Sequence, residues 1–218
     1  MLLAATRPEV RTGSAHLVAS EHASASDAAL TNNLRATINE LLAGENVSTW
    51  RIADSTGRIV LAAEPEFAGQ RIMTDLLDAT SRAIDDNKIQ FVPPSLMNGN
   101  TLPQMGFIAP ISTTADSKPI GVLVVRIDPR GSFSELFKAG QLGTTGETYA
   151  FDQQGRMISE SRFLEQLKSA NPALAKATTS VFIVNLRDYS NAAPGMPAAA
   201  LPLTKMAAAA IAGKAGSN

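Results

Sequence analysis

The stretch STWRIADSTGRIVLA at residues 48–62 has the pattern of a strand, a turn and a second strand. Polar and apolar residues alternate up to Asp54, and an apolar run follows Arg58. Between them, Asp54 can open the turn through its side chain, and Gly57 can adopt the positive φ that the turn needs. The stretch therefore predicts a β-hairpin.

The residues after the hairpin predict one helix and three further strands. A helix is expected over 72–86, where apolar residues recur at helical spacing. Strands are expected at 88–92, stopped by Pro93 and Pro94, at 104–111 and at 120–127. The last of these, IGVLVVRI, is almost wholly apolar, which is typical of a central strand. This order predicts an α+β fold, with residues 46–129 forming a five-stranded antiparallel sheet and a helical layer.

A long helix is predicted ahead of this unit, over residues 14–42 of an N-terminal stalk spanning 1–45. Its second half carries an apolar stripe made of Leu30, Leu34, Ile38, Leu41 and Leu42. Gly44 follows, where a helix commonly ends. We interpret the stripe as a packing seam against a sheet or another helix.

The string D-x-x-G-R, followed by two apolar residues, occurs at 54–60 and again at 152–158. The offset of 98 residues matches the length of a small domain, so we interpret the pair as an internal duplication. The second copy predicts strands at 148–152, 156–159 and 180–186 and helices at 163–168 and 204–213. Nothing after Leu186 resembles the strand pair 104–111 and 120–127. The second module, 143–218, is therefore expected to be incomplete.

A short helix is expected in the segment 130–142, which links the two modules. Ser132 and Glu135 have the spacing of a capping box. The string GTTGET at 143–148 resembles a phosphate-binding loop only in its glycines, since no lysine follows the second glycine.

The composition argues against several classes of function. Hydrophobic residues make up 44% of the 218, and 19 basic residues nearly balance 20 acidic ones. This balance gives no electrostatic reason to bind nucleic acid. The chain has no cysteine, and His16 and His22 alone do not make a zinc or catalytic site. With no nucleophile elbow or triad, we expect no enzyme activity, no cofactor and no metal.

Taken together, these residues resemble the double-Cache family, the tandem PAS-like ligand-sensing domains of bacterial transmembrane receptors. The long helix followed by a β-β-α-β-β-β unit carries the resemblance, as do IADSTGRIV at 52–60 and EPEFAG at 64–69. The most specific match is GTTGETYAFDQQGRMISESR at 143–162. LRD at 186–188 and PLTKMA at 202–207 are similar to relatives that precede kinase or cyclase output domains.

The resemblance implies the extracytoplasmic, periplasmic sensor region of an inner-membrane signalling protein. The longest nearly apolar stretch, 206–213, is far below the ~20 residues of a membrane-spanning helix. Membrane attachment is therefore expected through segments absent from this chain. By the same resemblance, the first module binds a small molecule and the second relays the signal toward the membrane.

The resemblance also implies a pocket in the first module, between the sheet and its overlying helix and loop. The family's amino-acid-binding motif uses Tyr, Arg and Trp, whereas the matching region here offers Arg71, Gln90 and Phe91. The ligand therefore stays open. An arginine such as Arg71 can hold a carboxylate, although a solvated surface position is the alternative.

Four further residues are candidates from their positions alone. Gln104 and Arg126 are polar residues on otherwise apolar strands, where each could face the pocket or point outward. Tyr149 and Arg162 flank the second hairpin and could meet over a second pocket, with core packing and a surface cap as the alternatives.

The leading interpretation is a small-molecule sensor with no catalytic activity of its own. The alternative is a structural or dimerisation module without a ligand, in which the stripe at 30–42 pairs with a partner helix. A homodimer through the N-terminal helix is expected in either case.

Overall fold

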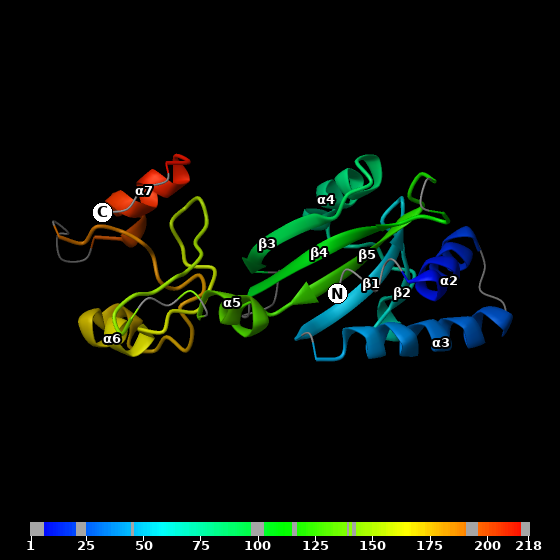
Figure 1. Ribbon diagram of the computed structural model, residues 1–218, viewed down its shortest axis with the longest axis horizontal. Helices are drawn as coiled ribbons and strands as arrows, with labels where there is room; N and C mark the ends of the chain where they lie inside the picture. Colours follow the sequence, from blue (N-terminus) through cyan, green and yellow to red (C-terminus); the bar gives the residue numbers. More distant parts are fainter. Residues whose placement is uncertain are drawn as a thin grey trace. The chain divides into compact units, whose positions relative to one another are not determined.

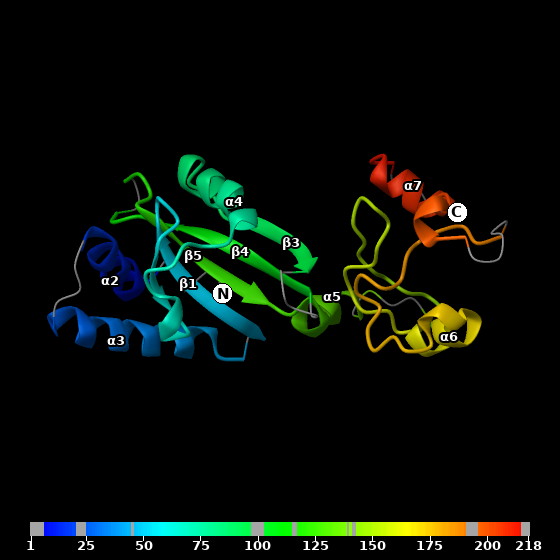
Figure 2. The same ribbon diagram turned by 180° about the vertical axis from the view of Figure 1, so that it is seen from behind.

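The hairpin predicted at 48–62 is present in the computed structural model as strands β1 (Val47–Asp54) and β2 (Ile59–Ala62). The structure describes residues 7–20, 25–44, 46–96, 103–114, 117–138, 140, 143–190 and 196–214. The chain divides into unit 1, residues 1–128, and unit 2, residues 129–218, and each is described by itself (Figures 1 and 2).

The turn between β1 and β2 is built around Asp54, as the sequence predicts. Its Oδ1 atom accepts hydrogen bonds from the backbone N–H groups of Thr56 at 2.9 Å and Arg58 at 3.0 Å. Gly57 has φ +83°, where a side chain would be strained. Burial raises the pKa of Asp54, but the hydrogen bonds from Thr56 and Arg58 outweigh burial and hold that pKa below its ordinary value.

Five antiparallel strands form one sheet in unit 1, in the order β2-β1-β5-β4-β3. The strands added to the hairpin are β3 (Gln90–Leu96), β4 (Pro103–Ile111) and β5 (Gly121–Ile127). β5 lies in the middle of the sheet and is buried along its whole length, as its apolar sequence predicts. The predicted α+β class and antiparallel sheet are confirmed.

The prediction that Pro93 and Pro94 stop β3 is wrong, because both lie inside the strand. β3 is an edge strand, where a missing N–H donor breaks no ladder bond. Its pairing with β4 shifts register between Val92 and Ser95, which brackets the two prolines. The proline pair therefore produces a local irregularity at the sheet edge and does not end the strand.

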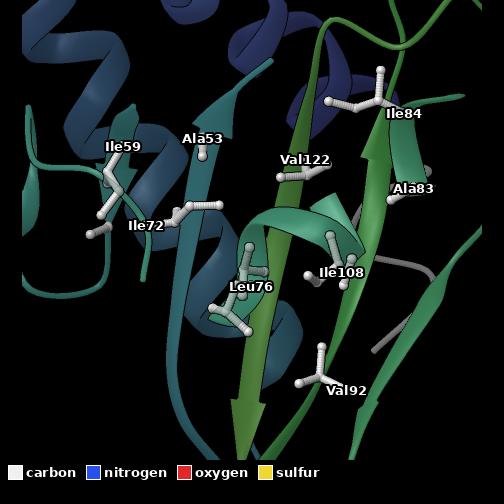
Figure 3. Packing of buried hydrophobic residues seen from close by; sticks show 12 residues of the cluster. Ala53, Ile59, Ile72, Leu76, Ala83, Ile84, Val92, Ile108 and Val122 are labelled. Carbon is white, nitrogen blue, oxygen red and sulfur yellow. The ribbon is translucent and has the colours of Figure 1, made fainter. Parts of the chain in front are cut away.

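Helix α4 (Thr74–Asp85) covers one face of the sheet, after a short 3₁₀ turn, η1 (Pro65–Phe67). The predicted helix over 72–86 is thus confirmed. In Figure 3 the Leu76 side chain of α4 lies over the sheet near Ile108 of β4 and Ile72 of the preceding loop. The alternate residues Val122 and Val124 of β5 belong to the same buried cluster. Burial of these side chains supplies the main stabilisation of the unit.

The single helix predicted over 14–42 is wrong, because two helices occupy this region: α2 (Pro8–Ala19) and α3 (Ala25–Leu42). The backbone is extended at Ser20, with φ −82° and ψ 113°, so α2 ends before it. Of the two histidines, His16 lies on an exposed position of α2, and His22 lies outside the described residues. Both helices are part of unit 1 and do not form a separate stalk.

The two N-terminal helices cover the face of the sheet opposite α4. α2 contacts α3 as well as strands β1, β2 and β4. The Trp50 side chain points away from the α4 face, and its indole N–H donates to Asn39 Oδ1 on α3 at 2.7 Å. The apolar stripe is buried at Leu34, Ile38 and Leu42, which confirms its interpretation as a packing seam. Unit 1 is thus a sheet between two helical layers (Figures 1 and 3).

Unit 2 departs from the strands that the sequence predicts at 148–152, 156–159 and 180–186. Its described residues hold only isolated bridges, which join Phe151 to Met157, Arg156 to Asn185, and Arg187 to Leu203. Around 180–186 the chain turns, since the Ser180 carbonyl accepts from the N–H groups of both Ile183 and Val184. Phe182 has φ +59°, which an extended strand does not contain.

The helices predicted in unit 2 are confirmed, as α6 (Leu164–Ala170) and α7 (Lys205–Ile211), and short turns η3 (Pro172–Leu174) and η4 (Ala198–Ala200) accompany them. The capping contact predicted for Ser132 lies outside the described side chains. An irregular turn, η2 (Pro129–Phe133), precedes helix α5 (Ser134–Lys138), which begins at Ser134. The Ser134 hydroxyl donates to the Pro129 carbonyl at 2.6 Å and accepts from the Glu160 N–H at 2.8 Å.

A network of serines and glutamates holds unit 2 together where unit 1 has a sheet. The buried hydroxyl of Ser180 accepts from the Ser161 N–H at 2.6 Å and donates to Glu160 Oε2 at 2.8 Å. Glu147 Oε1 accepts from the Ser161 hydroxyl at 2.8 Å and from the Arg162 N–H at 2.7 Å. These bonds satisfy backbone groups that a β-ladder would otherwise satisfy.

Candidate ligand-binding site

Three hollows are described in the structure, and they differ in the charge of their linings. One, of about 410 Å³, lies where α3 meets β1, and another, of about 400 Å³, lies in unit 2 beside α6. Neither has a charged side chain among its lining residues. The third, of about 110 Å³, lies between the sheet and the start of α4 and is lined by two arginines. We take this third cavity as the candidate site.

The strand register explains which side chains reach this cavity. Arg126 of β5 lies opposite Thr49 of β1 on one side and Gly106 of β4 on the other. Residues paired in this way point to the same face of a sheet. Gly106 leaves the space that the arginine needs, because a Cβ there would lie 3.1 Å from the Arg126 Cδ atom. The long side chain of Arg126 therefore lies along the sheet under α4.

Arg126 is buried yet has no hydrogen-bond partner within the described part of the chain. Its exposed fraction is 3%, and none of its three side-chain nitrogens is paired there. Burial lowers the pKa of Arg126; the charge of Asp75 opposes this effect and the charge of Arg51 adds to it. A guanidinium stays charged in proteins even so. An unpaired buried cation is costly, which makes Arg126 a functional candidate.

Arg51 of β1 is the second cation of the cavity. Its Cζ atom lies 4.2 Å from the centre of the Phe67 ring, in a cation–π contact, and its Nε atom is buried without a described partner. Gln104 of β4 adds a side-chain amide to the lining. Thr49 lines the cavity too, and its hydroxyl donates to Glu64 Oε2 at 2.8 Å.

The rest of the lining is mainly apolar. Ile72 and Leu76, from the loop and first turn of α4, and Val124 of β5 close the cavity from the core side. A pocket that joins an apolar wall to a few polar groups is the usual form of a small-molecule site. This one is small, since pockets for drug-sized ligands commonly reach about 300–1,000 Å³.

Two of the five residues predicted for the first module, Gln104 and Arg126, come together in the cavity. Arg71 lies elsewhere, on the surface, where its Nη1 atom donates to the Thr56 carbonyl at 3.0 Å. Gln90 lies opposite Ile108, at the other end of the β3–β4 pair from Gln104. Phe91 is 45% exposed and packs against Phe107 with the ring centres 5.5 Å apart.

The two residues predicted for a second pocket have separate neighbours in unit 2. Tyr149 packs against Phe151, and its pKa is raised by burial and then by the charge of Glu147. Arg162 donates to the Thr144 carbonyl and lies 4.6 Å from the centre of the Phe163 ring. The unit 2 hollow is lined instead by Leu167, Ala170, Asn171, Leu174, Ile183, Val184, Asn185 and Tyr189.

Arg51 and Thr49 line the cavity but are not among the site residues that the sequence predicts. Both belong to the alternating strand that precedes the D-x-x-G-R turn, on the same face as Ala53. The pattern of polar residues at alternate positions of β1 was the available signal, because such positions share one face of a strand.

The described residues contain no group of His, Cys, Asp and Glu side chains suited to hold a metal ion. Among the same residues, no helix is both long enough and apolar enough to cross a membrane.

Comparison with known proteins finds similarity at the level of structure. No family model and no curated protein matches the chain. The ligand-binding domain of the Campylobacter jejuni chemoreceptor Tlp3, in complex with 4-methylisoleucine, superposes with a TM-score of 0.50 at 18% identity. The match covers 79% of this chain and 66% of that one. The chain therefore shares the fold of this chemoreceptor domain.

Two further structures are less similar. The sensory domain of the same chemoreceptor with isoleucine bound has a TM-score of 0.48 at 19% identity, over 74% of this chain and 63% of that one. An extracellular ligand-binding receptor from Desulfohalobium retbaense has a TM-score of 0.43 at 14% identity, over 78% of this chain and 31% of that one. The chain thus spans just under two thirds of the Tlp3 domains.

Proposed function

We propose that the chain is the small-molecule-sensing region of a membrane-bound signalling receptor, outside the cytoplasm and without catalytic activity of its own. The module at 46–129 binds the ligand in the cavity between the sheet and α4. The module at 143–218 relays the resulting change toward the membrane, and the segment 130–142 links the two.

The buried, unpaired guanidinium of Arg126 is the observation that carries this proposal. A buried charge without a hydrogen-bond partner among the described residues is costly, so its presence is best explained by a ligand that pairs with it. The cavity around it joins two cations and an amide to an apolar wall, which is the composition of a binding site and not of an ordinary core.

The fold adds support. The Tlp3 domain that superposes on this chain is a chemoreceptor's ligand-binding domain, in complex with 4-methylisoleucine. The likeness to this domain supports a receptor role and a position outside the cytoplasm for the chain. The ligand itself is not carried over, because identity is only 18%.

Dimerisation through the N-terminal helix has less support than ligand binding. The stripe expected to meet a partner helix is already used within the chain: Leu34 is 4% and Ile38 0% exposed. Leu42 is buried as well. The stripe therefore holds α3 on its own unit and leaves little apolar surface for a second copy.

A thermal-shift screen of small metabolites on the full 218-residue chain tests the proposal. Compounds that bind the folded state raise the melting temperature by mass action. We expect at least one compound to raise Tm for the wild type and for Arg82→Met, which replaces an exposed arginine of α4. The same compound should leave Tm of Arg126→Met unchanged. If no compound shifts the wild type, or if Arg126→Met responds equally, the proposal fails.

A further inference from the structure

We infer that the cavity under α4 takes a short-chain monocarboxylate that carries no ammonium group. The inference rests on the proposed function and names the ligand class of that same site. It follows from the charge, the size and the polarity of the cavity lining.

The charge of the lining calls for an anion. Arg51 and Arg126 both line the cavity, and none of its lining residues is acidic. Two carboxylates that interact with lining residues lie outside the lining. Asp75 influences Arg126 but does not line the cavity, and Glu64 accepts the hydroxyl proton of Thr49. A bound anion would therefore be the partner that the Arg126 guanidinium and the Arg51 Nε atom lack within the described residues.

The form of the free donors favours a carboxylate. The Nε, Nη1 and Nη2 atoms of Arg126 are all unpaired within the described residues. A guanidinium with adjacent free N–H groups matches the two oxygens of a carboxylate in a forked pair of hydrogen bonds. The amide of Gln104 adds a further donor to the same cavity.

The size and the apolar wall limit the remainder of the ligand. The cavity of about 110 Å³ is well below the about 300–1,000 Å³ that pockets for drug-sized ligands commonly reach, so only a small ligand fits. Ile72, Leu76 and Val124 offer contacts for an alkyl group but no hydrogen bonds. A chain of two or three carbons attached to the carboxylate fits these limits, whereas a bare inorganic anion leaves the apolar wall unused.

The same lining disfavours α-amino acids. An ammonium group next to the carboxylate would be buried beside two arginines, with no carboxylate in the lining to accept it. Burying an unpaired charge carries a large penalty. The site should therefore reject an amino acid in favour of the carboxylate of the same length.

Three compounds of matched size separate these features: propionate, L-alanine and propionamide. Isothermal titration calorimetry on the full chain compares them with sodium nitrate at constant ionic strength. We expect propionate to bind at least tenfold more tightly than each of the other three. Arg126→Met should abolish the binding, and Arg126→Lys, which keeps the charge but loses the fork, should weaken it at least tenfold. Arg82→Met is the control and should bind propionate as the wild type does.

Each other outcome overturns a named part of the inference. Equal or tighter binding of L-alanine would contradict the exclusion of ammonium groups, and equal binding of propionamide would contradict the need for an anion. Equal binding of nitrate would contradict the claim that the ligand carries an alkyl group against the apolar wall. If none of the four binds while another metabolite shifts Tm, the ligand class is wrong and the sensing function stands. If no metabolite binds at all, both fall.

Discussion

The D-x-x-G-R turns at 54–58 and 152–156 have the same local structure and very different surroundings. In each, the aspartate Oδ1 atom accepts two backbone N–H groups, at 2.9 and 3.0 Å for Asp54 and at 2.9 Å for both bonds of Asp152. Gly57 and Gly155 have φ +83° and +76°. The first turn leads into a five-stranded sheet, whereas the second is followed by isolated bridges only.

This difference separates what is encoded locally from what depends on distant segments. Five residues suffice to build the turn, and they build it twice. The cavity needs Gln104 of β4 and Arg126 of β5, and these meet the β1 residues only because β5 pairs with β1 and β4 pairs with β5. No strand with these roles occurs in the described residues of unit 2. Among the described cavities, the one in the first module is thus lined by charged side chains from neighbouring strands, and the one in unit 2 is not.

The largest expected difference in stability is between alanine variants of the two turn glycines, Gly57 and Gly155. A Cβ at position 155 would lie 2.3 Å from the Leu203 Cδ2 atom, whereas at position 57 the nearest atom is Leu77 Cδ2 at 3.1 Å. Gly155→Ala should lower the free energy of unfolding by roughly 2–5 kcal/mol. Alanine is strained at a positive φ, and its Cβ would overpack against Leu203. Gly57→Ala should cost less. Hydrogen exchange of peptides that span each turn measures both losses.

Gly44→Ala is the matched control for these two variants. Gly44 has φ +84°, but no atom lies within 4 Å of the Cβ that alanine would add. Gly44→Ala should lower the free energy of unfolding by about 1–2 kcal/mol, because it adds backbone strain at a positive φ but no steric clash. A loss at position 155 no larger than that at position 44 would show that Leu203 moves aside freely.

The second effect concerns the polar network that replaces the sheet in unit 2. Ser180→Ala removes the acceptor of the Ser161 N–H and one of the two hydrogen bonds to Glu160 Oε2, which should lower the free energy of unfolding by about 1–3 kcal/mol. Ser169→Ala, on the exposed face of α6, is the control and should change stability by less than about 0.5 kcal/mol. Exchange rates of peptides over 159–163 report the loss. Equal behaviour of the two variants would mean that the network contributes little.

A smaller effect comes from the turn aspartates. Asp54→Ala and Asp152→Ala each remove the acceptor of two backbone N–H groups and should cost about 1–2 kcal/mol, as the loss of a helix N-cap does. Asp54→Asn keeps the acceptor and should cost less. Urea unfolding followed by circular dichroism measures these changes. A much smaller loss at one site would show that the two turns are not equivalent.

The lowered pKa of Asp54 adds a pH dependence with a definite sign. Its stabilising effect is fully present above the ordinary value of 3.8 and is lost as the pH falls through the lowered value of the folded state. The wild type should therefore lose more stability on acidification than Asp54→Asn does. Parallel pH profiles for the two proteins would contradict the lowered pKa.

The smallest effect concerns the arginines of the two turns. Arg58 Nε lies 3.4 Å from Asp54 Oδ2, whereas Arg156 Nε lies 2.7 Å from Asp152 Oδ2 and its Cζ atom also lies 4.6 Å from the centre of the Phe182 ring. Both side chains are over 40% exposed, so each pair is worth at most about 1 kcal/mol. Arg156→Ala should cost more than Arg58→Ala in the same unfolding measurement. The reverse order would contradict the shorter contact and the ring stacking.

The sequence predicts what depends on neighbours along the chain. The turn at Asp54, the helix at 72–86 and the buried strand at 120–127 follow from short patterns, and the structure has all three. The break at Ser20 and the turn at Phe182 were missed, because alanine-rich and apolar segments suit more than one backbone.

Two of the eight residues that line the candidate site were predictable in the same way. Gln104 and Arg126 stand out because each is a polar residue on an apolar strand. Whether they line the same cavity depends on the register of β4 and β5. Arg71 was chosen for its chemistry alone, and the structure places it on the surface at the Thr56 carbonyl.

The most direct test of the account is the stability of Arg126→Met without ligand. Trp50 is the single tryptophan and lies in unit 1, so its fluorescence during urea unfolding reports on the unit that holds the cavity. If Arg126 is a buried charge kept unpaired for a ligand, methionine should stabilise unit 1 by about 1–4 kcal/mol, with Arg82→Met unchanged. A loss of stability in Arg126→Met would show that the guanidinium supports the fold and would contradict its role as a ligand anchor.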